Sequence, residues 1–137
     1  MTDKPKILIV EKDIPAAMML VHTLTRAGCD VRVAPSARQG LDLARATQFN
    51  LVVLDLDLPD LKSLDLDEKF KQRLVLDHTP IVCISAQPCD EKRQHGLELG
   101  AVDYIEKSLR AEDWVPQLLS HIKAATNPIA VAESMAT

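Results

Sequence analysis

The sequence lacks the features that mark several classes of protein. Its 137 residues contain three cysteines, an odd number with no CxxC spacing, and Cys83 lies in an apolar run where a small buried hydrophobic side chain is expected. No apolar stretch approaches the length of a membrane span, and residues 1–6 are too few and too polar for a signal peptide. We therefore expect a reducing, cytoplasmic location and no membrane attachment.

Positive charge and metal-binding histidines are also scarce. The net charge is −4, the pI is near 5.5, and no basic stripe is clustered along the chain, which weighs against direct nucleic-acid binding. The four histidines share no ligand spacing, so none is assigned to a metal. With 47% hydrophobic and 26% charged residues, the chain is typical of one globular domain with a real core.

Apolar runs typical of strands alternate with segments of helical period. The predicted strands cover residues 7–10, 31–34, 51–54, 81–84 and 102–105. The predicted helices follow Asp13 and Ser36 as N-caps and also cover residues 64–74, 90–99 and 112–124. Strands alternating with helices predict βαβ crossovers, and therefore a doubly wound α/β fold with a parallel sheet covered on both faces.

The end of the chain departs from this regular pattern. Pro116 removes a helical hydrogen bond anywhere beyond a first turn, so the last helix is expected to start late or to bend there. Residues 125–137 have no clear period and contain Pro128. We therefore expect one domain over residues 1–124, followed by an extension or linker over 125–137.

Asp55 is the most informative residue. It directly follows four apolar residues, 51–54, which read as a strand buried on both faces of a parallel sheet. A carboxylate at that point lies at the carboxyl edge of the sheet, where open α/β folds bind their ligands.

Other polar residues follow neighbouring strands at the same edge. They are Glu11, Lys12 and Asp13 after the first strand, Ser85 after the fourth and Lys107 after the fifth. An aspartate in such a place can attack phosphorus and form an acyl phosphate. That chemistry needs positive charge beside the phosphoryl oxygens, normally a hard divalent ion held by carboxylates together with a lysine. Asp13 is equally well explained as a helix-capping acid.

Four separated motifs give the chain a specific resemblance. These are ILIV-E at 7–11, LVVLDLDLPD at 51–60, PIVCISA at 80–86 and LELGAVDYIEK at 97–107. In order and spacing they resemble the response-regulator receiver domain of two-component signalling, with Ser85 thirty and Lys107 fifty-two residues after Asp55. The resemblance covers about residues 5 to 124. It implies a flavodoxin-like fold of five parallel strands in the order 2-1-3-4-5 and five helices.

The resemblance also implies roles for individual residues. Asp55 would be the phosphoacceptor, Lys107 would contact the phosphoryl group, and the Ser85 hydroxyl could hydrogen-bond it. Ser85 and Tyr104 would be the pair that reorients on phosphorylation. Glu11, Asp55 and the backbone carbonyl of Asp57 would bind Mg²⁺. The partners implied are a sensor histidine kinase or phosphotransfer protein and a downstream protein that docks on residues 90–123, with a homodimer left open. The domain would be a signalling module and not an enzyme.

Three departures from the family pattern bear on the site. Lys12 stands where a second acid is usual, Ser108 where a cis-proline is usual, and Asp60-Leu61 where the loop usually has glycine. A lysine facing a bound cation at 4 Å costs on the order of 4 kcal/mol at an effective dielectric of 20. We therefore expect weak Mg²⁺ binding and slow phosphorylation, unless the lysine turns inward and itself neutralises Asp55.

Two other functions fit parts of the sequence. A pseudo-receiver would use the same fold as a binding module without phosphorylation, and Lys12 is the residue that favours it. An aspartate-nucleophile phosphatase of the haloacid dehalogenase type also has an Asp-x-Asp motif after a buried strand. That family places the motif on its first strand, whereas Asp55-x-Asp57 follows the third predicted strand here.

Overall fold

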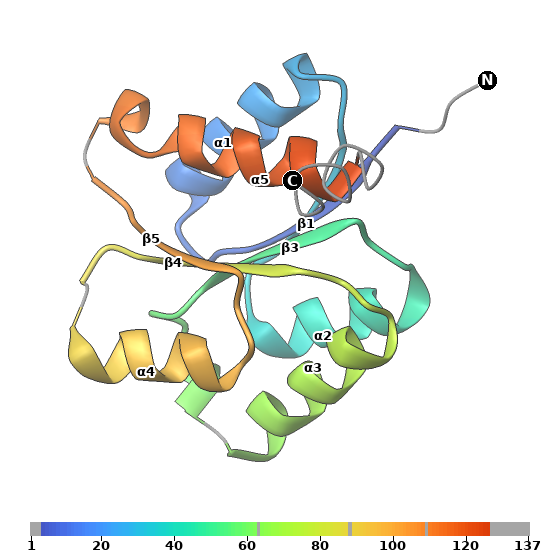
Figure 1. Ribbon diagram of the computed structural model, residues 1–137, viewed down its shortest axis with the longest axis vertical. Helices are drawn as coiled ribbons and strands as arrows, with labels where there is room; N and C mark the ends of the chain where they lie inside the picture. Colours follow the sequence, from blue (N-terminus) through green and yellow to red (C-terminus); the bar gives the residue numbers. More distant parts are fainter. Residues whose placement is uncertain (1–3, 63, 88, 109, 127–137) are drawn as a thin grey trace, which may run out of the picture.

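The computed structural model describes residues 4–62, 64–87, 89–108 and 110–126, and these residues form alternating strands and helices (Figure 1). The strands are β1 (Lys6–Val10), β2 (Asp30–Ala34), β3 (Leu51–Asp55), β4 (Ile81–Ser85) and β5 (Asp103–Glu106). The helices are α1 (Ile14–Arg26), α2 (Ala37–Ala46), α3 (Leu64–Leu76), α4 (Asp90–Glu98) and α5 (Val115–Thr126). Two short 3₁₀ turns, η1 (Pro59–Lys62) and η2 (Ala111–Asp113), precede α3 and α5.

The five described strands form one parallel sheet in the order β2-β1-β3-β4-β5. Every residue of β3 and β4 is buried, because helices cover both faces of these central strands. The doubly wound, flavodoxin-like fold predicted from the alternating elements is therefore confirmed. The continuous apolar runs of β3 and β4 are the direct consequence of burial on two faces.

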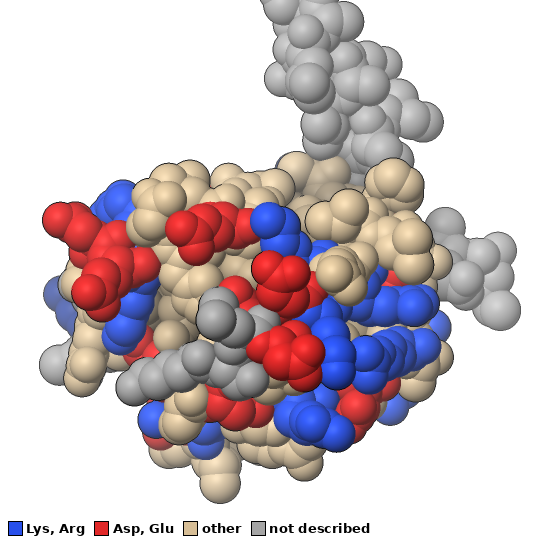
Figure 2. Space-filling view, turned by 90° about the horizontal axis from the view of Figure 1, so that it is seen from below, with Lys and Arg blue, Asp and Glu red and all other residues tan. Residues whose placement is uncertain are grey.

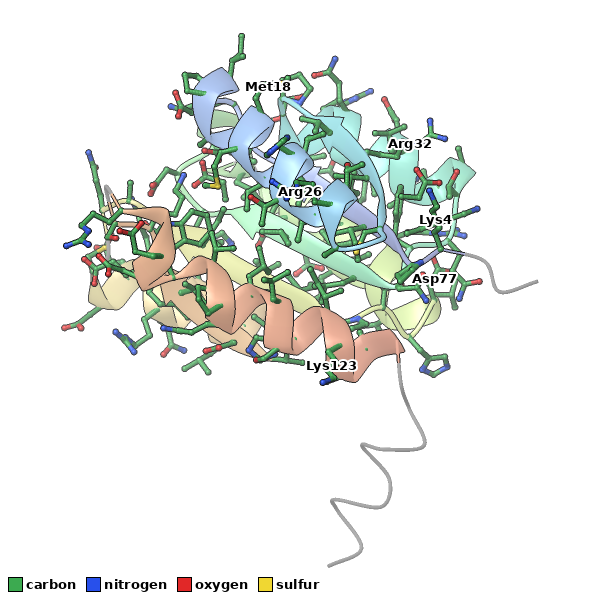
Figure 3. The ribbon with its side chains drawn as sticks, turned by 90° about the horizontal axis from the view of Figure 1, so that it is seen from above. Lys4, Met18, Arg26, Arg32, Asp77 and Lys123 are labelled. Carbon is green, nitrogen blue, oxygen red and sulfur yellow. The ribbon has the colours of Figure 1, made fainter. Side chains whose placement is uncertain are left out.

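The sheet separates two hydrophobic cores. In Figure 1, α2, α3 and α4 lie on one face and α1 and α5 on the other; Figure 3 shows α1 and α5 side by side. Val52 and Leu54 of β3 pack with Phe70 of α3 in the first core. Leu51 and Val53 belong to the second core, with the buried leucines of α1 and α5. Across the described residues, no helix has both the length and the hydrophobicity needed to cross a membrane.

The helix boundaries follow the predicted signals. Asp13 caps α1 by accepting a hydrogen bond of 3.2 Å from the Ala16 N–H, and Ser36 caps α2 through the Gln39 N–H at 3.2 Å. After α1, Gly28 has a φ of 93°, a left-handed conformation that glycine adopts without a steric penalty. Helix α5 begins at Val115, so Pro116 lies in its first turn, where its missing N–H costs nothing.

Several predicted boundaries were wrong by one to three residues, and the largest difference is the start of α5 at Val115, where residue 112 was predicted. Strand β5 begins at Asp103, one residue later than predicted. Val102 is apolar, which suggested a strand residue, but its side chain is 56% exposed. Strand β2 begins one residue early, at Asp30, and α3 continues to Leu76. Helix α5 continues to Thr126, beyond the expected end at residue 124, and residues 127–137 of the predicted extension lie outside the described residues.

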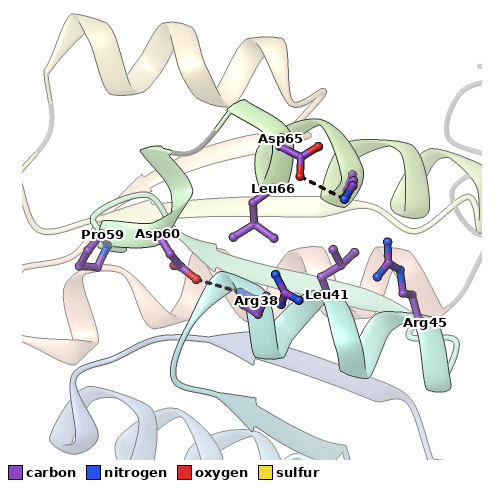
Figure 4. A pocket seen from close by; sticks show the side chains of 8 residues that line it. Arg38, Leu41, Arg45, Pro59, Asp60, Asp65 and Leu66 are labelled. Atoms are coloured by element: carbon purple, nitrogen blue, oxygen red, sulfur yellow. Dashed lines mark hydrogen bonds and ion pairs between the residues drawn. The ribbon is translucent and has the colours of Figure 1, made fainter.

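Basic side chains that are distant in sequence meet on the face formed by α2, α3 and α4. Figure 2 shows Lys and Arg gathered toward one side of this face. Arg38 and Arg45 of α2 and Lys69 of α3 line a hollow of about 360 Å³ between the two helices (Figure 4). The helix packing, and not a run of basic residues, produces this cluster.

Candidate functional site

The carboxyl ends of four strands surround one hollow at the edge of the sheet. Glu11 follows β1, Asp55 ends β3, Ser85 ends β4 and Lys107 follows β5. The hollow measures about 420 Å³ and is lined by Glu11, Lys12, Asp13, Asp55, Leu56, Asp57, Ala86, Gln87, Lys92 and Lys107. The predicted convergence of these strand ends therefore occurs.

Lys107 bridges the two buried acids of the hollow. Its ammonium lies 2.8 Å from Glu11 Oε1 and 3.3 Å from Asp55 Oδ2. The side chains of Glu11 and Asp55 are 0% and 2% exposed, so this cation is their main compensation for lost hydration. The Lys107 N–H also donates to the Ser85 carbonyl at 2.9 Å, which continues the pairing of β5 with β4 and fixes the lysine backbone.

One ammonium does not balance two carboxylates. Burial, and then the neighbouring Asp55 carboxylate, raises the pKa of Glu11 to about 8, although Lys107 acts to lower it. Burial by itself lowers the pKa of Lys107, but the bond to Glu11 and the charge of Asp55 outweigh it and raise that pKa overall. The raised pKa of Glu11 favours the form in which this carboxyl group keeps its proton, and in that form the cluster is closest to electrical balance.

Asp57 contributes more than a backbone carbonyl. Its N–H donates to Asp55 Oδ1 at 2.8 Å, and its carboxylate accepts from Ser85 Oγ and from the Ala86 N–H, each at 2.9 Å. The ammonium of Lys92, in the first turn of α4, pairs with the same carboxylate. Burial by itself raises the pKa of Asp57, but the hydrogen bonds from Lys92, Ala86 and Ser85 outweigh it and hold that pKa below its usual value.

Lys12 lies at the rim of the hollow and is exposed. It forms no ion pair with any residue that the structure describes, and Lys107 occupies the position beside Asp55 that an inward-turned Lys12 would have taken. The structure thus has Lys107, and not an inward-turned Lys12, as the cation beside Asp55. The short side chain of Asp13 is used to cap α1, which leaves Glu11 as the buried acid after β1.

Tyr104 lies on β5 opposite Cys83 of β4, on the side of the sheet that α4 covers. Its ring packs against the first hydrophobic core, and the Arg93 guanidinium lies 5.2 Å from the ring centroid. The Tyr104 hydroxyl is buried and has no hydrogen-bond partner among the described residues. That Ser85 and Tyr104 reorient together on phosphorylation stays a prediction.

The loops that depart from the family pattern still position the site. The Lys107–Ser108 peptide is trans, and Lys107 nevertheless reaches both acids. In place of a glycine loop, η1 carries Asp60, whose carboxylate accepts from the Ala37 and Arg38 N–H groups at the start of α2.

Sequence reasoning missed two side chains that line the hollow, the Asp57 carboxylate and Lys92. The Asp-x-Asp motif signals Asp57, but only as a neighbour of Asp55. Lys92 lies 35 residues away from Asp57 and carries no signal of its own, because the length and path of the β4–α4 segment decide where its ammonium lies.

The residues present fit a hard divalent cation in part. Glu11 Oε2 is buried without a hydrogen-bond partner among the described residues, and Asp55 lies beside it. No group of three or more His, Cys, Asp or Glu side chains with the arrangement of a metal site occurs in the described ranges. The Asp57 carboxylate accepts a hydrogen bond from Ser85. A cation here would thus use two carboxylates and a backbone carbonyl, the set expected for Glu11, Asp55 and Asp57.

Comparison with known proteins agrees with this geometry. The response regulator receiver domain family matches residues 7–119, so the chain belongs to that family. It is 34% identical over 119 residues to the response regulator ArlR of Staphylococcus aureus, over 87% of this chain and 51% of that protein. The chain thus spans about half the length of the curated relatives it matches.

Solved structures resemble the whole described domain. The receiver domain of HemR from Leptospira biflexa is 33% identical, with a TM-score of 0.74 over 87% of this chain and 94% of that one. A CheY-like receiver domain from Methanospirillum hungatei has a TM-score of 0.76 at 23% identity, over 92% of this chain and 99% of that one, which supports the fold. The chain is a receiver domain of two-component signal transduction, and the haloacid dehalogenase alternative is not supported.

Proposed function

We propose that Asp55 accepts a phosphoryl group from a phosphohistidine of a sensor kinase or phosphotransfer protein. The observation that carries this proposal is the buried Asp55 carboxylate, which lines a polar hollow and lies 3.3 Å from the Lys107 ammonium. A carboxylate oxygen attacks phosphorus and forms an acyl phosphate, while the phosphorus–nitrogen bond of the donor breaks and leaves its electron pair on the imidazole. Lys107 offsets the charge of the phosphoryl oxygens.

Mg²⁺ is the cofactor that the family implies, and Glu11, Asp55 and the Asp57 carbonyl are the residues that would hold it. When bound, it supplies positive charge that stabilises the transferring phosphoryl group. Lys12 at the rim opposes its binding, so we propose weak affinity.

Two surfaces are proposed for partners. Ile14 and Met18 of α1 are 73% and 61% exposed, and Ile14 directly follows the acids at the rim, so a phosphodonor would dock there (Figure 3).

The downstream partner is proposed to dock on residues 90–123, where Leu97 and Val102 are 66% and 56% exposed. Chemical-shift changes confined to the opposite face on adding a partner would contradict this second assignment.

A cytoplasmic location belongs to the same proposal, as the described cysteines are free thiols.

A pseudo-receiver is the second candidate, and Lys12 is the observation that favours it. Intact-mass measurement after incubation with acetyl phosphate and magnesium separates the two. We expect the added mass of one phosphoryl group, slowly acquired, and none in the Asp55→Asn variant. If the native protein gains no mass under conditions that label another receiver domain completely, the phosphoacceptor proposal is wrong and the pseudo-receiver remains.

A further inference from the structure

The Asp57 carboxylate accepts hydrogen bonds from three neighbouring donors, as a bound anion would. One oxygen accepts from the Ser85 hydroxyl and pairs with Lys92, and the other accepts from the Ala86 N–H. Ser85 is completely buried, and the Asp57 side chain is only 17% exposed. Ser85 ends β4, Ala86 follows it and Lys92 belongs to α4, whereas Asp57 belongs to the segment after β3.

The same donors are the ones that a phosphoryl group on Asp55 needs. An acyl phosphate brings close to two negative charges and several acceptor oxygens into the hollow. Besides Lys107, the Ser85 hydroxyl, the Ala86 N–H and Lys92 are donors at this side of the hollow. Asp57 already occupies all three, and the bond of 2.8 Å from its N–H to Asp55 Oδ1 keeps the two acids adjacent.

We propose that the Asp57 carboxylate is an internal stand-in for the phosphoryl group, and that phosphorylation of Asp55 displaces it from Ser85, Ala86 and Lys92. The phosphoryl oxygens then accept from Ser85 and Ala86. The displaced carboxylate turns outward, because two anions cannot share the same donors. The proposal rests on phosphorylation of Asp55, and the displacement itself exchanges hydrogen bonds only, with no further covalent change.

Lys92 carries this exchange to α4. Gly96 is the only buried residue of this helix, and the N-cap Cys89 provides no side-chain hydrogen bond. Two polar contacts also hold α4: His95 lies 2.7 Å from Asp67 of α3, and the Arg93 guanidinium lies 5.2 Å from the centroid of the Tyr104 ring. A helix held in this way moves when one of its anchors is lost, since few apolar contacts resist it. The start of α4 is therefore the element that reports the state of Asp55.

Backbone amide chemical shifts of the unphosphorylated protein test the exchange directly. In Asp57→Asn and Asp57→Ala, we expect the Ser85, Ala86 and Lys92 amides to move toward their positions in the phosphorylated native protein. Lys92→Gln should move the amides at the start of α4 but leave Ser85 and Ala86 in place. Asp65→Asn, which removes one exposed acid of α3 that pairs with Lys69, is the control for charge and should move none of them.

Labelling by acetyl phosphate with magnesium gives a second readout. Removing the competing carboxylate should speed labelling of Asp55 about tenfold in Asp57→Asn, the size expected for one charged hydrogen-bond competitor. Unmoved Ser85 and Ala86 amides in both Asp57 variants, or slower labelling than in the native protein, would overturn the stand-in role. Failure of the native protein and of both variants to be labelled would instead refute the phosphoacceptor function. The difference in Ser85 and Ala86 amide shifts between the unphosphorylated native protein and the Asp57 variants would still decide whether Asp57 holds these donors.

Discussion

Lys107 and Glu11 are 96 residues apart in sequence, yet the Lys107 ammonium donates a hydrogen bond of 2.8 Å to a completely buried Glu11 carboxyl group. The same ammonium contacts Asp55, so one cation serves two acids. This shared cation sets both the electrostatics of the site and the response of the domain to pH.

The free energy of unfolding should fall as pH rises between about 4.5 and about 8. Burial and the neighbouring Asp55 raise the pKa of Glu11 from 4.5 to about 8, so over this range the folded protein holds a proton that the unfolded chain has released. Stability from that proton is complete below the lower value and is lost as pH rises through the upper one. Urea unfolding without metal, measured across the range, checks this.

Glu11→Gln is the matched variant for the pH dependence. It keeps the shape of the side chain and an acceptor for Lys107 but cannot titrate, so the slope of unfolding free energy against pH should become flatter. Taking the difference between the two proteins removes the contributions of the histidines. An equal slope in both proteins would mean that Glu11 is ionised throughout this pH range and that its pKa is not raised in the folded protein.

Lys12→Asp should tighten magnesium binding by on the order of tenfold and speed phosphorylation of Asp55. The side chain lies at the exposed rim, where the interaction of two charges 4 Å apart is about 1 kcal/mol in water. Lys4→Asp is the control, since it makes the same change of charge before β1, at the opposite edge of the sheet (Figure 3). Isothermal titration with MgCl₂ measures the affinity. Equal gains in both variants would show a general effect of net charge and not of the rim.

Gly40 and Gly96 should respond oppositely to alanine. A Cβ at Gly40 of α2 would lie 2.9 Å from Val10 Cγ2 and 3.2 Å from the Phe70 ring, so Gly40→Ala should lower the unfolding free energy by about 1–3 kcal/mol. At Gly96 of α4 the nearest atom is Cys83 Sγ at 3.7 Å, an ordinary contact. Gly96→Ala should therefore raise stability by about 0.5–1 kcal/mol through its better helix propensity. Thermal unfolding of both variants measures these changes in stability. Changes of the same sign in Gly40→Ala and Gly96→Ala would contradict this packing.

Asp60→Ala should destabilise the domain by about 1 kcal/mol, within the range measured for helix caps. The Asp60 carboxylate accepts from the Ala37 N–H at 3.1 Å and from the Arg38 N–H at 2.9 Å, so the turn after β3 caps α2 (Figure 4). Asp65→Ala, in the first turn of α3, removes an acid that is 76% exposed and should cost little. Amide hydrogen exchange at residues 37 and 38 locates the effect. Unchanged protection there would show that Ser36 alone caps the helix.

Much of the fold was predictable because it depends on local patterns. The buried run before Asp55, the caps Asp13 and Ser36, and the position of Pro116 each act within a few residues of the chain. Four of the site residues were also predictable, since parallel strands bring their carboxyl ends to one edge. The start of β5 was missed because Val102 is apolar but exposed, and hydrophobicity alone does not report which side of a strand end faces solvent.

The sequence by itself determined the order of elements, the parallel sheet and the placement of Glu11, Asp55, Ser85 and Lys107 at one edge. Only the tertiary structure decided which of these groups meet. Lys107 takes both acids because the β4–β5 pairing sets its reach, and the Asp57 carboxylate turns to Ser85, Ala86 and Lys92. Such contacts depend on loop paths and side-chain rotamers between segments about 30 or more residues apart, and on the burial that makes an unpaired charge costly. No local pattern in the sequence carries that information.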